Sequence, residues 1–324
     1  MKRGTEIAVP HHSTAVAAGA RSLPSRRRRR VPWAGYGLVA PVVVAIGVIL
    51  AYPIYKLVRL SFEQYGLFEL VQHKGHWIAL HNYGLVLHDS VFWDTVVRTV
   101  VFTIANVGLT IGLGTLIALL LVQISPVVRV MLTTGLVLVW SMPVVVAVQI
   151  FYWMTNFENG VLNYLLTQLQ LGDFFHHDWY SSTLSSLSMV TLLIVWGALP
   201  FVVVTVYAGL SQVPRELVEA AEIDGAGPIR VFRDVTFPIL KPILLILTSL
   251  SIIWDFGVFA QPYLLIGASH VDATNYLMGV YVFIKGYGAH DFGRGAAISL
   301  LMLLMIAVLS VVYVRQMVRA GDVE

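Results

Sequence analysis

A polar segment rich in small residues, 219–226, stands between two long apolar stretches of this chain. Its sequence is Glu219-Ala220-Ala221-Glu222-Ile223-Asp224-Gly225-Ala226, and Val235-Thr236-Phe237-Pro238 follows shortly after. A loop that only joins two membrane spans has no need of this composition. Acidic edges around a shallow alanine face suit recognition by another protein, and this is the chemistry that the residue types predict.

The spacing of these residues predicts a helix, a turn and a second helix. Pro214 suits the first turn of a helix, where its missing N–H costs nothing, and the charge of Glu216 is favourable there. Gly225 is placed to end this helix in a left-handed conformation. Pro228 can begin the second helix, and Pro238 begins the next apolar stretch. One face of the first helix carries residues at three-and-four spacing, namely Leu217, Ala220, Ala221 and Asp224.

The composition is that of a protein that crosses a membrane several times. The 324 residues are 57% hydrophobic and 12% charged, whereas soluble domains average about 25% charged residues. A membrane-spanning helix needs about 20 mainly apolar residues. Six stretches qualify: 34–60, 95–122, 127–153, 187–210, 238–260 and 296–313. We therefore predict an all-α polytopic membrane protein with six transmembrane helices and a helical loop between the fourth and fifth.

The placement of lysine and arginine predicts the orientation. With the N-terminus in the cytoplasm, 15 of the 21 basic residues fall inside and the other six outside. The reverse orientation would export the run from Arg26 to Arg30, so we reject it. Both termini are then cytoplasmic in a multi-pass protein of the plasma or inner membrane. The expected parts are a disordered basic tail at 1–32, a first transmembrane helix at 33–62, an extracytoplasmic loop at 63–93, a transmembrane core at 94–316 with a cytoplasmic loop at 211–237, and a C-terminus at 317–324.

Polar and aromatic residues within or near the spans are candidates for a solute path, because polar groups inside a membrane are costly and mostly functional. Aromatic faces, together with amide or carboxylate hydrogen bonds, suit a sugar ring. Asp255 is the strongest candidate, although a salt bridge or exposure at the interface would also explain it. For each aromatic residue the alternative is packing between helices. The full set is Trp140, Gln149, Trp153, Asn156, Trp254, Asp255, Tyr263 and Tyr281.

Several other kinds of chemistry are disfavoured by the sequence. No Gly-x-x-x-x-Gly-Lys-Ser/Thr motif occurs, so we expect no phosphate-binding loop and no ATP hydrolysis by this chain. The absence of cysteine excludes disulfides and thiolate metal sites. We interpret the arginine run at 26–30 as a determinant of orientation rather than a nucleic-acid patch. We also expect no metal, because no compact ligand spacing occurs among His73, His76, His81, His88, His176 and His177.

The run Glu219-Ala220-Ala221, followed by Gly225, Val235 and Pro238, resembles the EAA signature of permease subunits in binding-protein-dependent ABC importers. The spacing agrees, with three residues between Ala221 and Gly225 and nine between Gly225 and Val235. Phe237 stands where the family usually has Leu, and Gly267-Ala268-Ser269 departs from the Gly-Gly-Pro common in relatives. Further matches to sugar permeases of the maltose and glycerol-3-phosphate type include Ala40-Pro41, Tyr52-Pro53, Asn82-Tyr83 and Gly295-Ala296-Ala297.

The resemblance implies a permease subunit of an ATP-driven importer for a sugar or sugar-like solute. Its implied partners are a second homologous permease subunit, two cytoplasmic ATPase subunits and an external solute-binding protein. The chain itself is expected to hold no cofactor, with ATP and Mg on the ATPase. The implied ATPase-coupling residues are Arg215, Glu216, Glu219, Ala220, Ala221, Asp224 and Gly225.

Two other functions remain as alternatives at this point. An ion-coupled secondary transporter of small polar solutes would show intramembrane carboxylates and often inverted repeats, and the sequence has few of the former and no repeat that we can see. A membrane-embedded enzyme would need His, Asp and Glu clusters facing one another across the spans, and the histidines lie mostly outside them.

Overall fold

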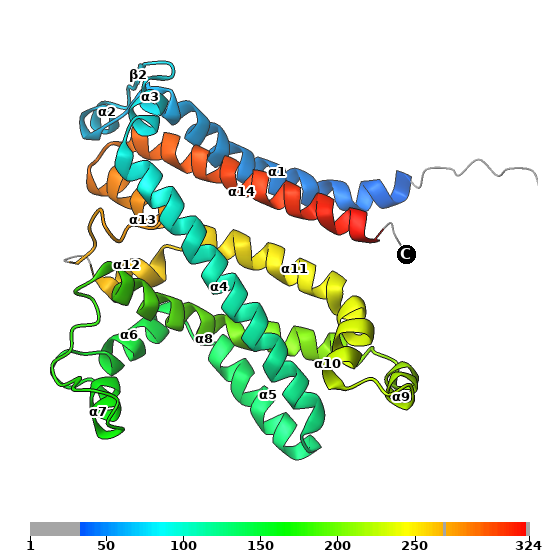
Figure 1. Ribbon diagram of the computed structural model, residues 1–324. Coiled ribbons are helices and arrows are strands. Elements are labelled where there is room, and N and C mark those ends of the chain that lie inside the picture. Colours follow the sequence, from blue (N-terminus) through cyan, green and yellow to red (C-terminus); the bar gives the residue numbers. More distant parts are fainter. Residues whose placement is uncertain (1–32, 268–269, 322–324) are drawn as a thin grey trace, which may run out of the picture. The chain divides into compact units, whose positions relative to one another are not determined.

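The computed structural model describes residues 33–267 and 270–321 (Figure 1), so the expected tail at 1–32 lies outside the described residues. The chain divides into two units, 1–51 and 52–324. Helix α1 (Trp33–Ser61) begins in the first unit and ends in the second, and its bounds agree with the first transmembrane helix expected at 33–62. The remaining elements all belong to the 52–324 unit.

Two long helices, α4 (Ser90–Gln123) and α8 (Thr183–Leu210), pack against each other along much of their length. The carboxylate of Asp89 caps the start of α4, which satisfies an N–H group that has no partner inside the helix. The two helices come close at Gly114, where an added Cβ would lie 2.5 Å from Cγ1 of Val202. Small residues of this kind allow membrane helices to approach each other.

Shorter elements connect and flank these helices. An antiparallel hairpin of β1 (Glu63–Gln64) and β2 (His76–Trp77) follows α1. The other elements are α2 (Leu67–Gln72), α3 (His81–Leu87), α5 (Pro126–Trp140), α6 (Val144–Met154), α7 (Val161–Gln168), α9 (Arg215–Ile223), α10 (Pro228–Val231), the π-helical segment η1 (Phe232–Thr236), α11 (Phe237–Phe256), α12 (Ala260–Ile266), α13 (Met278–Phe283), the π-helical segment η2 (Ile284–Gly288) and α14 (Phe292–Gly321).

The stretch expected to form one span at 127–153 is two helices. α5 and α6 are bent by 100° at the break between Trp140 and Val144. Pro143 is the N-cap of α6, and a proline both lacks a backbone donor and disfavours helical geometry at the preceding residue, Met142. Prolines are often tolerated inside membrane helices, but here Pro143 lies at the break between two helices.

The fifth span begins earlier than the expected position at Pro238. α10, η1 and α11 run on without interruption, and residues 228–256 qualify as one span. Pro238 is the second residue of α11. Because its nitrogen cannot donate and its ring crowds the preceding turn, a wider π-helical turn at η1 accommodates it without ending the helix.

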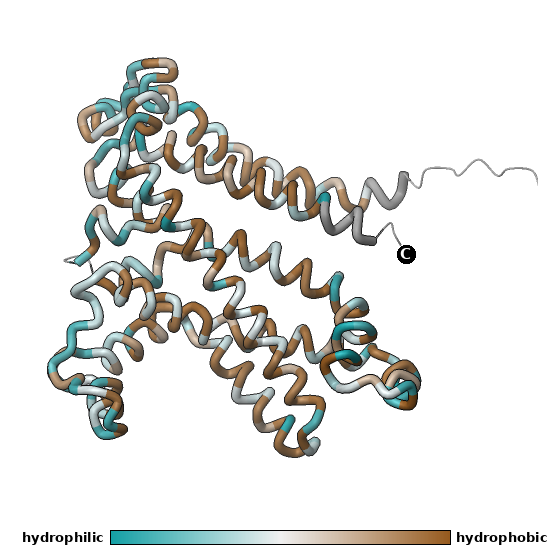
Figure 2. The backbone as a smooth tube through the Cα atoms, in the orientation of Figure 1, coloured by the Kyte–Doolittle hydropathy of each residue, from teal (hydrophilic) through white to brown (hydrophobic). Residues whose placement is uncertain are grey.

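Among the described residues, five helices are long and apolar enough to cross a membrane, and there are six such spans if the bent pair of α5 and α6 is counted as one broken span. Within the 52–324 unit, Figure 2 shows hydrophobic residues along the long helices and hydrophilic residues gathered around α9, α10 and the loops at the other end. The predicted all-α polytopic fold is confirmed. The last helix, α14, starts at Phe292 and continues to Gly321, well past the expected end of its span at 313.

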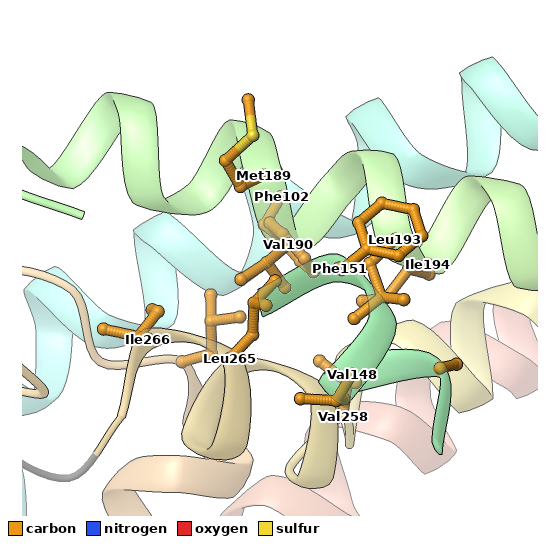
Figure 3. Packing of buried hydrophobic residues seen from close by; sticks show 12 residues of the cluster. Phe102, Val148, Phe151, Met189, Val190, Leu193, Ile194, Val258, Leu265 and Ile266 are labelled. Carbon is orange, nitrogen blue, oxygen red and sulfur yellow. The ribbon is translucent and has the colours of Figure 1, made fainter. Parts of the chain in front are cut away.

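Apolar side chains from distant parts of the sequence hold the bundle together. One cluster joins α4, α6, α8 and α12 through Phe102, Phe151, Leu193 and Leu265 (Figure 3). Because lipid tails are as apolar as leucine, such contacts stabilise a membrane bundle through close packing rather than through transfer from water. The cluster fixes α6, which follows the break, against α8 and α12.

Candidate functional site

The loop between α8 and α11 contains the helix and turn that the spacing predicts. The N–H of Ala226 donates to the carbonyl of Ala221 (2.9 Å), and the N–H of Gly225 donates to the carbonyl of Glu222 (3.0 Å). This pair of bonds is a Schellman motif, which places a left-handed residue directly after the helix. Gly225 has a φ of 80°. The prediction that Gly225 ends α9 in a left-handed conformation is confirmed.

Helix α9 presents two different faces. Arg215, Glu219 and Glu222, spaced one turn apart, line a cavity of about 730 Å³ together with the ends of α4 and α8. Ala220 and Ile223 are exposed, and neither lines this cavity. The residues expected to form one coupling surface are therefore divided: some face the bundle and others face away from it.

Two large apolar side chains flank the turn after α9. The side chains of Ile223 and Ile229 are 85% and 84% exposed, beside charged residues that include Arg230 and Asp234, whose Nε and Oδ2 lie 3.6 Å apart. Exposed apolar side chains rimmed by charge are typical of protein interaction sites. Ile223 is not among the coupling residues that the sequence predicts. Its signal in the sequence is a large apolar residue in the last turn of the predicted helix, directly before Asp224 and the turn at Gly225.

The loop is joined to a membrane span by helical backbone. α9 packs on α10 and η1, where Val231 and Thr236 are buried, and η1 continues into α11. A displacement of α9 can therefore reach the α11 span through the packing of α9 on α10 and η1.

An aromatic group lies among the spans. The rings of Trp140 and Phe201 are stacked with centroids 5.9 Å apart, and the rings of Phe201 and Trp254 lie 5.7 Å apart. Trp140 is 56% and Trp254 50% exposed. Trp140 is the last residue before the break between α5 and α6, and irregular backbone at membrane depth is tolerated where it is buried or lines a water-filled cavity. Two predicted path residues are thus brought together by one, Phe201, that the sequence argument missed.

Asp255 follows Trp254 in α11 and is 7% exposed. Within the described part of the chain, its carboxylate has no ion pair and no hydrogen bond. The salt bridge considered as an alternative from the sequence is therefore not formed with any described residue. An intramembrane carboxylate without a partner is a functional candidate.

The other predicted path residues occupy varied positions. Gln149 and Trp153 are exposed on α6. Asn156 accepts hydrogen bonds from the N–H groups of Glu158 (3.0 Å) and Asn159 (3.1 Å), so it shapes the turn after α6. Tyr263 is half-buried and stacks on Phe259, with centroids 5.2 Å apart. Their contact with a solute stays a prediction.

Tyr281 is completely buried and joins α13 to the start of α4. Its hydroxyl donates to Oδ2 of Asp89 (3.0 Å), and Nζ of Lys285 lies 3.5 Å from the same oxygen. Burial acts to raise the pKa of Asp89, but the hydrogen bonds from Tyr281 and the Val91 N–H and the charge of Lys285 outweigh it, and the pKa falls below its usual value. Burial and the bond to Asp89 raise the pKa of Tyr281. These contacts give Tyr281 a structural role between α13 and the start of α4.

No group of three or more His, Asp or Glu side chains within the described ranges could hold a metal ion. Two of the histidines make local contacts: Nδ1 of His73 lies 2.7 Å from the carbonyl oxygen of Leu70, and Nδ1 of His88 lies 2.8 Å from that of Gly84.

Comparisons with known proteins agree with this architecture. Residues 110–319 match the family described as "Binding-protein-dependent transport system inner membrane component". The diacetylchitobiose uptake system permease protein DasB of Streptomyces coelicolor is 38% identical over 90% of this chain and 88% of its own length. The sulfoquinovosyl glycerol transport system permease protein SmoG of Agrobacterium fabrum is 30% identical over 88% of this chain and 90% of its own.

A solved structure has the same fold. A chain of a bacterial ABC transporter involved in the import of the acidic polysaccharide alginate superimposes with a TM-score of 0.75, at 16% sequence identity, over 89% of this chain and 96% of that chain. At this identity the likeness shows the fold alone.

The helical spans, the helix–turn–helix loop joined to α11 and the aromatic group at a broken span define a membrane-embedded transport subunit. The chain belongs to the family of inner membrane components of binding-protein-dependent transport systems. It is an ABC transporter permease, and permeases of this family are not themselves enzymes. The ion-coupled secondary transporter considered from the sequence is not favoured.

Proposed function

We propose that this chain is a permease subunit that imports a carbohydrate, driven by ATP hydrolysis on separate subunits. The observation that carries the proposal is the α9–Gly225–α10 loop, which presents exposed apolar side chains and whose second helix continues through η1 into the α11 span. A loop that presents exposed apolar side chains and is joined to a span by continuous helical backbone suits the transmission of force from a partner.

The partner at this loop is a cytoplasmic ATPase that holds ATP and Mg. Ala220, Ile223 and Ile229 supply a shallow apolar contact, with the charges of Arg230 and Asp234 around it. Glu219, on the cavity side of α9, is placed to pair with a basic group that enters between α9 and the bundle. Nucleotide-driven closure of two ATPase subunits would then move α9, and with it α11.

The solute path runs past Trp140, Phe201, Trp254 and Asp255. Sugar rings have apolar faces and hydroxyl edges, so aromatic faces and a carboxylate are suitable contacts. A second homologous permease subunit encloses the other side of this path, and an external binding protein delivers the solute. The distribution of the basic residues supports a cytoplasmic location for both termini and for the α9–α10 loop.

The substrate is a small carbohydrate. This proposal is supported by relatives whose names refer to diacetylchitobiose and sulfoquinovosyl glycerol, and diacetylchitobiose is therefore the first probe to offer to the partner binding protein.

The coupling role is tested with Glu219→Lys in the assembled complex. Charge reversal at α9 is expected to abolish the stimulation of ATP hydrolysis by the loaded binding protein while the complex remains in the membrane. Unchanged stimulation in Glu219→Lys would remove Glu219 from the coupling mechanism.

A further inference from the structure

Arg129, near the start of α5, makes an unusually complete set of contacts at one end of the bundle. Its Nε donates to the carbonyl of Leu121 (2.7 Å), and its Nη2 donates to the carbonyls of Val122 (3.0 Å) and Ile124 (2.9 Å). Its Nη1 donates to the hydroxyl of Tyr207 on α8 (3.1 Å), and the guanidinium carbon lies 5.6 Å from the centre of the Tyr207 ring. Four of the five guanidinium N–H groups are thereby engaged.

These contacts supply hydrogen-bond donors to carbonyl groups at the end of α4. The last four carbonyls of a helix have no partner within it, and Leu121 and Val122 belong to the last turn of α4. A positive charge at this end is also favourable because of the helix dipole. Only the planar fork of arginine supplies several donors in fixed directions, whereas lysine is a point charge on a flexible chain. Arg129 therefore fastens α4, α5 and α8 to one another.

The fastened ends form one wall of the cavity beside α9. Arg129 and Tyr207 line this cavity, as do Arg215, Glu219 and Glu222 from α9. α9 itself packs on α10 and η1, which lead to α11. One side of the cavity is thus joined to the α11 span. On the other side, Arg129 adds directional hydrogen bonds to the apolar cluster that contains Leu121 and Val206.

We infer that Arg129 is a positioning residue for energy coupling: it keeps the ends of α4, α5 and α8 together while α9 moves, so that the movement passes to α11. Without it, the turn between α4 and α5 separates from α8 and absorbs the displacement. The inference rests on the proposed function, because it requires that ATP moves α9.

The experiment uses spin-labelled cysteines in the full chain, assembled with its partner permease and ATPase, and the natural chain contains no cysteine. One label pair, Val127→Cys with Gln212→Cys, reports the separation of α5 from the end of α8. A second pair, Val127→Cys with Leu217→Cys, reports the position of α9. All three positions are exposed. Distances are measured by double electron–electron resonance without nucleotide and with ATP in the absence of Mg²⁺.

With Arg129 present, ATP is expected to change the distance between the labels at 127 and 217, which reports α9. The distance between the labels at 127 and 212, which reports α5 and α8, is expected to remain unchanged. In Arg129→Gln, ATP is expected to shift the pair between α5 and α8 by more than about 2 Å, the upper end of ordinary helix shifts at interfaces. Arg129→Lys should resemble Arg129→Gln, and Tyr207→Phe, which keeps the ring, should give a smaller shift. Arg315→Gln, at an exposed arginine on α14, is the matched control and should behave as the wild type.

The possible outcomes distinguish the proposed function of the chain from the positioning role of Arg129. If ATP does not move the pair that includes α9 in the wild type, the proposed function is wrong. If α9 moves and the pair between α5 and α8 remains unchanged in Arg129→Gln, the positioning role is wrong. A purely stabilising role would give this second result together with a lower melting temperature.

Discussion

Replacement of Gly225 by alanine tests whether the shape of the α9–α10 turn matters for coupling. Gly225 has a φ of 80°, and an added Cβ there would meet no described atom within 4 Å. The cost of Gly225→Ala is therefore conformational rather than steric. A left-handed residue with a side chain costs about 1–2 kcal/mol, which lowers the population of the formed turn by about 5- to 30-fold.

The chain offers two matched comparisons. Gly227, two residues later, has a φ of −73°, so Gly227→Ala is expected to be neutral or slightly stabilising because alanine restricts the unfolded chain. Gly225→Asn should recover much of the loss, since asparagine tolerates the left-handed region. The three variants thus share one segment and differ in the conformation that they demand.

Two measurements report the result. Hydrogen–deuterium exchange of the peptide that contains α9 should become faster in Gly225→Ala only, because the bonds of Gly225 and Ala226 to Glu222 and Ala221 are weakened. Stimulation of ATP hydrolysis by the binding protein should fall in the same variant. Equal exchange and equal stimulation in Gly225→Ala and Gly227→Ala would refute the argument that a left-handed turn positions the loop.

Three further predictions concern the bundle. Asp89→Asn should lower the free energy of unfolding by about 1–2 kcal/mol near neutral pH. Because the pKa of Asp89 is lowered in the folded protein, this stabilisation is present above the unfolded pKa and is lost as the pH falls through the folded pKa. The denaturation midpoints of wild type and variant should therefore converge in acid. Gly295→Ala places a Cβ 2.4 Å from a backbone carbon of Gly286 and should cost about 1–3 kcal/mol, whereas Gly112→Ala, with open space among the described atoms, should not; equal melting temperatures would contradict the close approach. Trp254→Ala should reduce solute uptake without lowering membrane levels, and uptake equal to that of the wild type would exclude its ring from the path.

The long elements were predictable because their signals are strong. Runs of more than 20 apolar residues and the turn at Gly225 depend on local chemistry, which is visible in the sequence. The break at Pro143 was not foreseen, because prolines also occur within continuous membrane helices, as Pro200 does in α8. Whether a proline ends a helix depends on neighbours that the sequence does not place in space.

The candidate site was only partly predictable for the same reason. Spacing located α9, but the division between the face with Glu219 and the face with Ile223 depends on the position of α9 across the cavity from the ends of α4 and α8. The contact of Phe201 with Trp140 and Trp254 joins three helices that are distant in sequence. Arg129 was counted only as a basic residue that indicated orientation, since its four hydrogen bonds exist only once the helix ends meet.

The central claim is that the α9–α10 loop is where an ATPase engages this permease. It is tested most directly by the labelling rate of Ile223→Cys with a membrane-impermeant maleimide in inside-out vesicles, in the absence of any other cysteine in this chain. Because Ile223 is 85% exposed, the account predicts fast labelling of the permease alone and strong protection when the ATPase is present. Equally fast labelling with and without the ATPase would contradict the claim.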